Sequence, residues 1–227
     1  MQALNCKTKF YTAWSGGKDA CLALYKMQQQ GHVLTGLLTM MNSQNTLSRA
    51  HHLPKELIAQ QAKALGVPLF AHPTSHAEYQ TQFQAALSQM KQAGTNHLVL
   101  GDIDLQAHQE WQQQQGKLTE TTPLFPLWLQ DHTTLVQAFL QAGFQATIIS
   151  ILPQKVPAEF LGKPFNQETI QALDDLNIDV CAEGGEFHTV VTNGPNFSHP
   201  IPLNVNDATL RTDGDYGYHY LDFSPPQ

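Results

Sequence analysis

The stretch SGGKD places two glycines, a cation and an anion directly after an apolar run. Because glycine has no Cβ, the backbone N–H groups at Gly16 and Gly17 can approach an anion closely. Ser15 adds a hydroxyl donor, and Lys18 adds a positive charge that suits phosphate oxygens. Asp19 cannot bind an anion, so two roles stay open for it: holding Mg²⁺ against phosphates, or stabilising the start of the next helix. The stretch therefore predicts a phosphate site.

A second group of polar residues follows another apolar run, in LVLGDID. Gly101 precedes Asp102, and Asp104 comes two residues later. In an open parallel sheet, ligands bind outside the carboxyl ends of the strands, where the strand order reverses. If the first and fourth strands are neighbours, Asp102 lies beside SGGKD and is a candidate to orient a ribose, Mg²⁺ or an attacking substrate. The alternative is that Asp102 caps the next helix. Met40 ends the second apolar run, and there we expect it to border a nucleotide base.

The third candidate is the turn in CAEGGEFHT, where Glu183 and Glu186 flank Gly184 and Gly185. Carboxylates at this position are suited to binding an ammonium ion or to positioning an amine nucleophile. We expect the glycines to project Glu186 into a cleft between two domains. The alternative is an ordinary turn at the entry to a hairpin, with both acids solvated.

Two histidines lie near these segments. His188 follows Glu186 by two residues and shares its face if a strand begins there. His51 lies in the polar segment before the second long helical pattern. Because histidine titrates near neutrality, either is a candidate general base, and either is equally open to a structural hydrogen-bonding role.

The elements that position these residues alternate regularly in the first part of the chain. The patterns predict strands and helices in turn, with Gly or Pro at several helix ends. Such alternation is typical of βαβ units and of a mainly parallel sheet, hence an α/β fold. The predicted strands are 10–14, 33–41, 67–72, 97–102 and 123–128, and the predicted helices are 18–30, 54–66, 76–93 and 105–115.

Beyond residue 130 the pattern changes. A helix at 132–142 and a strand at 146–152 precede a part of the chain richer in turn residues. Short strands are predicted at 188–193, 201–205 and 217–223. We therefore divide the chain into an α/β domain, 1–130, and a smaller α+β domain, 131–227.

Composition excludes several classes of function. The net charge is −7 with no Lys/Arg cluster, so we expect no nucleic-acid partner. No apolar run reaches the length of a membrane span, and the N-terminus lacks the pattern of a signal peptide. The three cysteines lie far apart and read as free thiols, which favours a reducing, cytoplasmic location.

The motifs together resemble a known family. Neither GxxxxGK[ST] nor GxGxxG is present, but SGGKD resembles the pyrophosphate loop SGGxDS of the N-type ATP pyrophosphatases, with Ala20 in place of the last serine. The ordered set SGGKD, HHLPKELIAQQAKALGVPL, LVLGDI, FPLW, QAGFQATI and EGGEFHT…NGPNF resembles the diphthine–ammonia ligase family, over about residues 8–203. The bacterial members are the most similar.

This resemblance implies a fold and a reaction. The implied fold is a Rossmann-like adenine-nucleotide-hydrolase (HUP) parallel sheet that binds ATP, with a smaller domain that holds the substrate. The implied reaction uses ATP and Mg²⁺ to adenylate a carboxylate, and ammonia then displaces AMP. The implied partners are ammonia and an acceptor, small or protein-bound, for which diphthine and a corrinoid-type acid both remain open. A homodimer is a further expectation.

Carried onto matching positions, the resemblance implies roles for individual residues. The implied ATP-binding residues are Ser15, Gly16, Gly17, Lys18, Asp19 and Gly101. Met40 is expected to join them because of its place near a strand end, and Asp19 is expected to bind magnesium because of its carboxylate. The implied substrate-binding residues are Glu183, Gly184, Gly185 and Glu186, and His188 is expected to join them because of its spacing from Glu186. The expected catalytic residues are Lys18, Asp102 and Glu186. Two alternative functions stay open: a non-catalytic ATP- or AMP-binding module, and a tRNA-modifying enzyme of the same superfamily.

Overall fold

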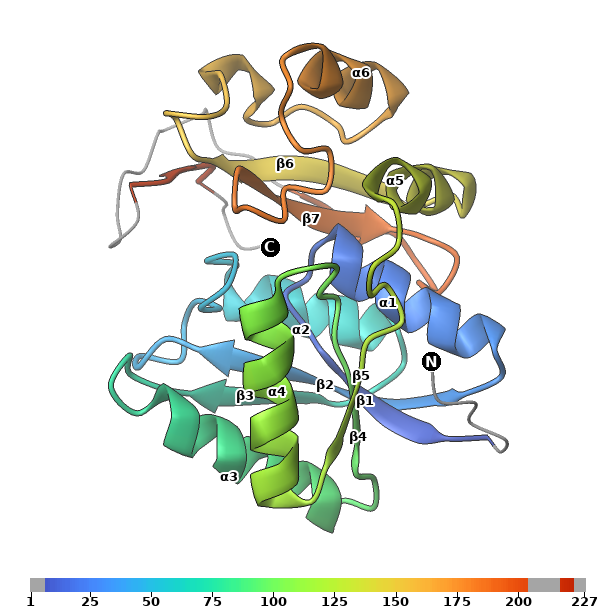
Figure 1. Cartoon of the computed structure of the whole chain (residues 1–227), viewed down its shortest axis with the longest axis vertical. Coiled ribbons are helices and arrows are strands. Elements are labelled where there is room, and N and C mark those ends of the chain that lie inside the picture. The colour runs from blue at the N-terminus through green and yellow to red at the C-terminus, as the bar shows by residue number, and fades with distance from the viewer. Residues whose placement is uncertain (1–6, 204–216, 223–227) are drawn as a thin grey trace.

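The computed structural model describes residues 7–203 and 217–222, and within them the chain forms two sheets, one above the other (Figure 1). The first sheet is parallel throughout, in the order β3-β2-β1-β4-β5, so its strand order reverses between β1 and β4. The predicted α/β fold is therefore confirmed, and the first and fourth strands are neighbours, which is the condition for Asp102 to lie beside SGGKD. The strands are β1 (Lys9–Ala13), β2 (Val33–Met41), β3 (Leu69–Pro73), β4 (His97–Val99) and β5 (Thr122–Leu124).

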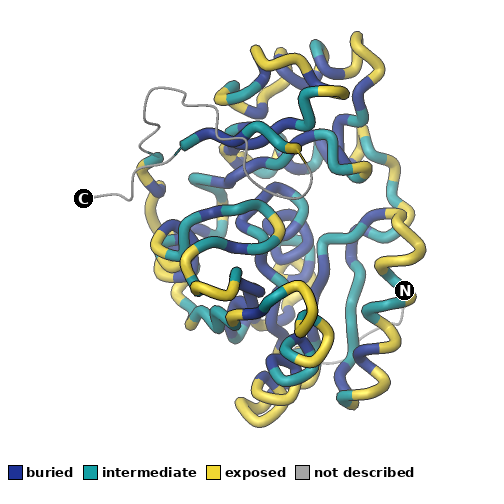
Figure 2. The backbone as a smooth tube through the Cα atoms, turned by 90° about the vertical axis from the view of Figure 1, so that its left-hand side faces the viewer, coloured by how far each residue is buried: buried dark blue, intermediate teal, exposed yellow. Residues whose placement is uncertain are grey.

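Helices cover both faces of the first sheet. Successive strand residues point to opposite faces, so Phe10 packs in the cluster that includes α1 while Tyr11 packs in the cluster that includes α3. Figure 1 shows α1 and α2 between the two sheets, with α3 and α4 on the other face. These helices are α1 (Lys18–Gln29), α2 (Lys55–Ala64), α3 (Tyr79–Gln92) and α4 (Gln106–Thr119). Exposed positions occur on the outward turns of these helices and in the loops of both parts of the chain (Figure 2).

The second sheet is antiparallel, with β6 (Gln145–Ile151) between β7 (Phe187–Asn193) and β8 (His219–Tyr220). It carries α5 (His132–Gln141), α6 (Gln167–Asp175) and a short 3₁₀ helix, η1 (Ala158–Phe160). The smaller α+β part of the prediction is thus present. One apolar cluster runs through α1, α5 and both sheets, so the two parts of the chain share a core.

Several predicted elements were wrong in detail. The strand predicted at 123–128 ends at Leu124, because Pro126 has no N–H with which to continue the ladder and a turn follows. Residues 201–203 form no strand, and 204–205 lie outside the described residues. The strand predicted at 217–223 is only β8, and residue 223 is not described.

Helix α6 was not predicted. Its N-cap is Asn166, whose side-chain oxygen accepts from the Thr169 N–H at 3.0 Å. Ile170 and Leu173 then bury one face of the helix. An asparagine N-cap before this apolar spacing is a signal that the sequence did contain.

No helix in the described ranges combines the length and apolar character that crossing a membrane requires.

Candidate active site

A cavity of about 400 Å³ lies at the carboxyl ends of β1, β2 and β4, against the turn that leads into β7. It therefore sits where the strand order reverses, as predicted for a ligand site. Most of the predicted site residues line it: Ser15, Lys18, Asp19, Met40, Gly101, Asp102, Glu183, Gly185 and His188. Gly16, Gly17, Gly184 and Glu186 are not part of the lining.

The SGGKD loop is tightly enclosed. Gly16 has φ of +81°, and a Cβ there would lie 2.7 Å from both Gln61 Oε1 and Leu53 Cδ1. Gly17 is the N-cap of α1, and a Cβ there would collide with His51 and lie 3.0 Å from the Thr189 carbonyl oxygen. Close packing against neighbouring groups thus requires both glycines.

Hydrogen bonds join this loop to β7. The Val191 N–H donates to the Gly16 carbonyl at 2.9 Å, and the Lys18 N–H donates to Thr189 Oγ1 at 3.1 Å. Fully buried Gln61 donates to the carbonyls of Gly16 and Val191, at 3.0 and 2.8 Å. The loop that was expected to hold phosphate is therefore also a junction between the two sheets.

Lys18 is buried, and its ammonium is already engaged. Nζ lies 2.8 Å from Asp19 Oδ2 and donates to the Cys181 carbonyl oxygen. Burial opposes the charged form of Lys18, but the negative groups around it, Asp19 first among them, keep its pKa above the ordinary value. The carboxylate of Asp19 pairs with Lys18. It does not cap α1, because Gly17 is the N-cap of this helix.

Gly101 and Asp102 reach the cavity from the end of β4. A Cβ at Gly101 would lie 2.9 Å from the carbonyl carbon of Asp19, so only glycine allows α1 and this segment to approach so closely. Asp102 lies 3.4 Å from His108 Nδ1 and does not cap α4, whose N-cap is Leu105. The hydrogen bond with Asp102 raises the pKa of His108, although burial of the histidine acts in the opposite direction.

Glu183 crosses from the second part of the chain to the first. Its Oε1 accepts from the N–H groups of Ile103 and Asp104, at 3.0 and 3.4 Å. Burial raises the pKa of Glu183, and the nearby charges of Asp19 and Asp102 act in the same direction. The two N–H donors lower the pKa, but by less. A carboxylate with a raised pKa at a cavity wall is suited to exchanging a proton.

Glu186 does not project into the cleft, contrary to the expectation from sequence. Its Oε1 pairs with Lys155 Nζ at 2.8 Å, and its Oε2 is buried without a hydrogen-bond partner. The turn after β6 supplies Lys155, which also donates to the Gly184 carbonyl at 3.3 Å. The cation on that side draws Glu186 away from the cavity that Glu183 faces.

The two candidate histidines lie together. Their rings have centroids 4.5 Å apart, and both line the cavity. His51 Nδ1 lies 3.1 Å from the Thr189 carbonyl, and His188 Nδ1 lies 2.7 Å from Ser150 Oγ. Burial, followed by the charge of Lys18, lowers the pKa of His188 to about 4. Burial and the neighbouring His188 likewise lower the pKa of His51. Both rings are therefore neutral at pH 7, and the Nδ1 atom of each is already engaged in a hydrogen bond.

Sequence reasoning missed Arg49. This residue lines the cavity, its N–H donates to the Met40 carbonyl at 3.0 Å, and its guanidinium lies 6.0 Å from the centre of the Tyr79 ring. Among the described residues, no carboxylate forms an ion pair with it. The available signal was its rarity: the acidic chain has only two arginines, and this one precedes His51 by two residues.

Comparisons with known proteins cover nearly the whole chain. Residues 8–117 match the family model described as the diphthamide synthase N-terminal domain, and residues 131–223 match that of the diphthamide synthase C-terminal domain. The diphthine–ammonia ligase of Danio rerio is 21% identical, over 88% of this chain and 88% of the relative. The enzyme of the same name from Bos taurus is 22% identical, over 87% and 84%.

A solved structure is also similar in outline. Its title describes a predicted subunit of tRNA methyltransferase from Methanocaldococcus jannaschii. The TM-score is 0.46 at 16% identity, over 82% of this chain and 97% of that one.

Proposed function

Because the chain belongs to the diphthamide synthase family, we propose that it is an ATP-dependent ligase that converts a carboxylate to an amide with ammonia. The observation that carries this proposal is a single cavity lined by the SGGKD loop, by Asp102 and by Glu183. Groups suited to a nucleotide and groups suited to an amine therefore face the same space.

In the proposed reaction, a carboxylate oxygen of the acceptor attacks the α-phosphorus of ATP, and pyrophosphate leaves. Ammonia then attacks the acyl carbon, and AMP leaves with the former carboxylate oxygen. The residues fit these tasks. Arg49 is the cavity cation without an acidic partner, so it is available to an anionic phosphate, whereas Lys18 is shared with Asp19.

The acidic residues fit Mg²⁺, which prefers oxygen ligands and usually binds with one or two carboxylates plus phosphate oxygens. The Asp19 side chain is 30% exposed, and that of Asp102 is 16% exposed. When bound, the ion would neutralise charge on the phosphates. Asp19 and Asp102, which both line the cavity, would hold that ion.

Glu183 is the proposed proton acceptor in the second step. An ammonium ion must lose a proton to become a nucleophile, and a further proton leaves as the amide forms. Glu183 faces the cavity, and its raised pKa makes it a better base than an ordinary carboxylate. The two N–H donors from the segment after β4 orient it. Glu186, paired with Lys155, would instead help to hold the turn.

The products of ATP cleavage test this proposal. Purified protein is incubated with Mg²⁺, ATP labelled at the α-phosphate, ammonium and a panel of carboxylates that includes diphthine. We expect equal amounts of AMP and pyrophosphate, dependent on both ammonium and one carboxylate. Formation of ADP alone, or tight ATP binding without AMP under every condition, would contradict the ligase. Arg49→Gln should weaken ATP binding about 10-fold, and Lys63→Gln, at an exposed position of α2, is its control.

A further inference from the structure

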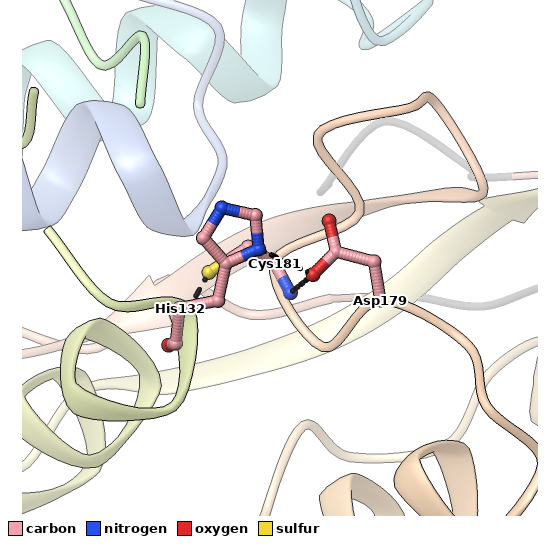
Figure 3. Close-up of side chains that lie close together, drawn as sticks. All are labelled: His132, Asp179 and Cys181. Atoms are coloured by element: carbon pink, nitrogen blue, oxygen red, sulfur yellow. Dashed lines mark hydrogen bonds and ion pairs between the residues drawn. The ribbon is translucent and has the colours of Figure 1, made fainter. Parts of the chain in front are cut away.

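Three side chains with metal-binding atoms meet where α5 begins and where the turn before β7 starts (Figure 3). His132, Asp179 and Cys181 form this His–Asp–Cys cluster, and one ligand atom from each lies within 4.8 Å of the others. Among the described residues, no other group of His, Cys, Asp and Glu side chains meets that criterion. None of the three lines the cavity described above.

Both ring nitrogens of His132 contact carboxylate oxygens. Its Nε2 lies 3.2 Å from Asp104 Oδ2, and its Nδ1 lies 2.6 Å from Asp179 Oδ1. Histidines that bind metals usually donate the second ring N–H to a carboxylate, as Nε2 can here. Nδ1 then turns its lone pair toward the Asp179 oxygen. Two acceptor atoms that close require a proton or a metal ion between them.

Hydrogen bonds to neighbouring backbone groups fix the positions of the other two candidate ligands, Asp179 and Cys181. Asp179 Oδ1 accepts from the Cys181 N–H at 3.0 Å, and Oδ2 accepts from the Glu183 N–H at 2.8 Å. Cys181 Sγ is buried and lies 3.4 Å from the carbonyl oxygen of His132. The carboxylate and the thiol are therefore fixed on one short turn, and the imidazole comes from another element.

We propose that the His–Asp–Cys cluster binds Zn²⁺ or a similar transition-metal ion. Nitrogen, oxygen and sulfur ligands suit Zn²⁺, whereas a thiolate does not suit Mg²⁺. Bonds of about 2.0–2.3 Å in a tetrahedral site place the ligand atoms roughly 3.3–3.8 Å apart, so small movements suffice. Binding releases the thiol proton of Cys181 and any proton on His132 Nδ1 to solvent. Water supplies the fourth ligand, and the exposed edges of His132 and Asp179, each 27% exposed, give access.

Such an ion would act on the neighbouring turn. The Cys181 carbonyl accepts from Lys18, and Glu183 reaches the segment after β4. A metal bound to Asp179 and Cys181 would thus hold the turn that makes both contacts. This inference goes beyond the proposed ligase function and does not depend on it.

Cobalt binding tests the site without ATP or any acceptor. Co²⁺ added to the metal-free, reduced protein should give one equivalent of a species with a thiolate-to-cobalt charge-transfer band, which Zn²⁺ displaces. Cys181→Ser should abolish the band. Cys21→Ala, which changes the other buried cysteine of the described residues, should retain it. Asp104→Asn should keep the band but weaken Co²⁺ binding about 10-fold, because it removes only the partner of the ligand His132.

Circular dichroism establishes that each variant is folded, and thermal unfolding gives a second measurement. Zn²⁺ should raise the melting temperature of the wild type and of Cys21→Ala, but not that of folded Cys181→Ser. Absence of the band from the wild type overturns the proposal, because His132 then simply bridges two acids through protons. Persistence of the band in Cys181→Ser also overturns it.

Discussion

Two pairs of glycines lie in turns beside the same cavity, and the pairs differ in how tightly they are packed. Gly16 and Gly17 lie between the two sheets, where Cβ atoms would meet Gln61, Leu53, His51 and the Thr189 backbone. Gly184 is exposed, and a Cβ there would meet only the end of the Glu186 side chain, 2.5 Å from Oε1. Gly185 has φ of +74° and would place a Cβ 2.7 Å from Tyr218 Oη.

The difference shows that two similar turns can differ in how many of their glycines the packing requires. In SGGKD both glycines are packed against neighbouring groups, Gly16 also has positive φ, and the loop joins the sheets through bonds to Val191 and Thr189. In EGGEF only Gly185 combines positive φ with a close neighbour, whereas Gly184 is exposed, and the turn directs Glu183 and Glu186 to different sides. The first pair should therefore resist substitution more strongly than the second.

Alanine substitution gives the largest expected contrast. Gly17→Ala forces a methyl group against His51 and a backbone oxygen that cannot rotate away, and we expect a loss of about 3 kcal/mol in the free energy of unfolding. Gly184→Ala displaces only a flexible carboxylate, and we expect a loss of less than about 1 kcal/mol. Urea unfolding measures both. Equal losses would contradict the distinction between the two turns.

The second contrast concerns the acids beside Gly184 and Gly185. Glu183→Gln keeps the shape but removes the base, so we expect the ammonia-dependent rate to fall about 10²-fold while ATP binding remains. Glu186→Gln affects a residue off the cavity, and we expect a fall of only a few-fold. AMP formation with saturating acceptor, measured alongside ATP affinity by calorimetry, compares them. A larger loss in Glu186→Gln would restore the role expected from sequence and remove Glu183 as the base.

The same contrast predicts a pH dependence. Protonated Glu183 cannot accept a proton, so the ammonia-dependent rate should rise with pH through a pKa above the usual range for glutamate, and Glu183→Gln should lose that rise.

The sequence predicted well those features that depend on local pattern. Alternating apolar and helical segments gave the parallel sheet, and the prediction that the strand order reverses next to SGGKD placed Asp102 at the cavity. These features follow from periodicity and from the general geometry of α/β sheets.

The features that it missed depend on contacts between distant segments. Nothing local shows that Lys155 draws Glu186 away, or that buried Gln61 bonds both Gly16 and Val191. The His–Asp–Cys cluster is similar, since His132 is 47 residues from Asp179. The free thiols expected from the scattered cysteines are present at Cys21 and Cys181, but the cluster around Cys181 lacks the short spacing by which metal motifs are recognised in a sequence.

The smallest expected effect is a loss of folding stability in acid that is due to His188, which lies between the SGGKD and EGGEF turns. His188 lies in the wall between them, beside Lys18, His51 and Tyr218, and bonds to Ser150. Burial lowers its pKa to about 4 in the folded protein, against about 6.5 in an unfolded chain. Between these values the unfolded chain binds a proton that the folded protein does not. Stability is therefore full above about pH 6.5 and declines as pH falls toward 4.

We expect His188→Asn to be less sensitive to acid than the wild type. Between pH 7 and pH 5 the wild type should lose about 1 to 2 kcal/mol more of its free energy of unfolding than the variant, since one unit of pKa corresponds to about 1.4 kcal/mol. Urea unfolding at both pH values measures the difference, and His199→Asn, at an exposed position, should behave as the wild type does. His51 has a pKa lowered in the same direction, so part of the slope should remain in His188→Asn. If the variant loses stability with acid as steeply as the wild type, then His188 is charged or solvated in the folded protein. Water would then reach His188, in contrast to the close packing around the neighbouring Gly17.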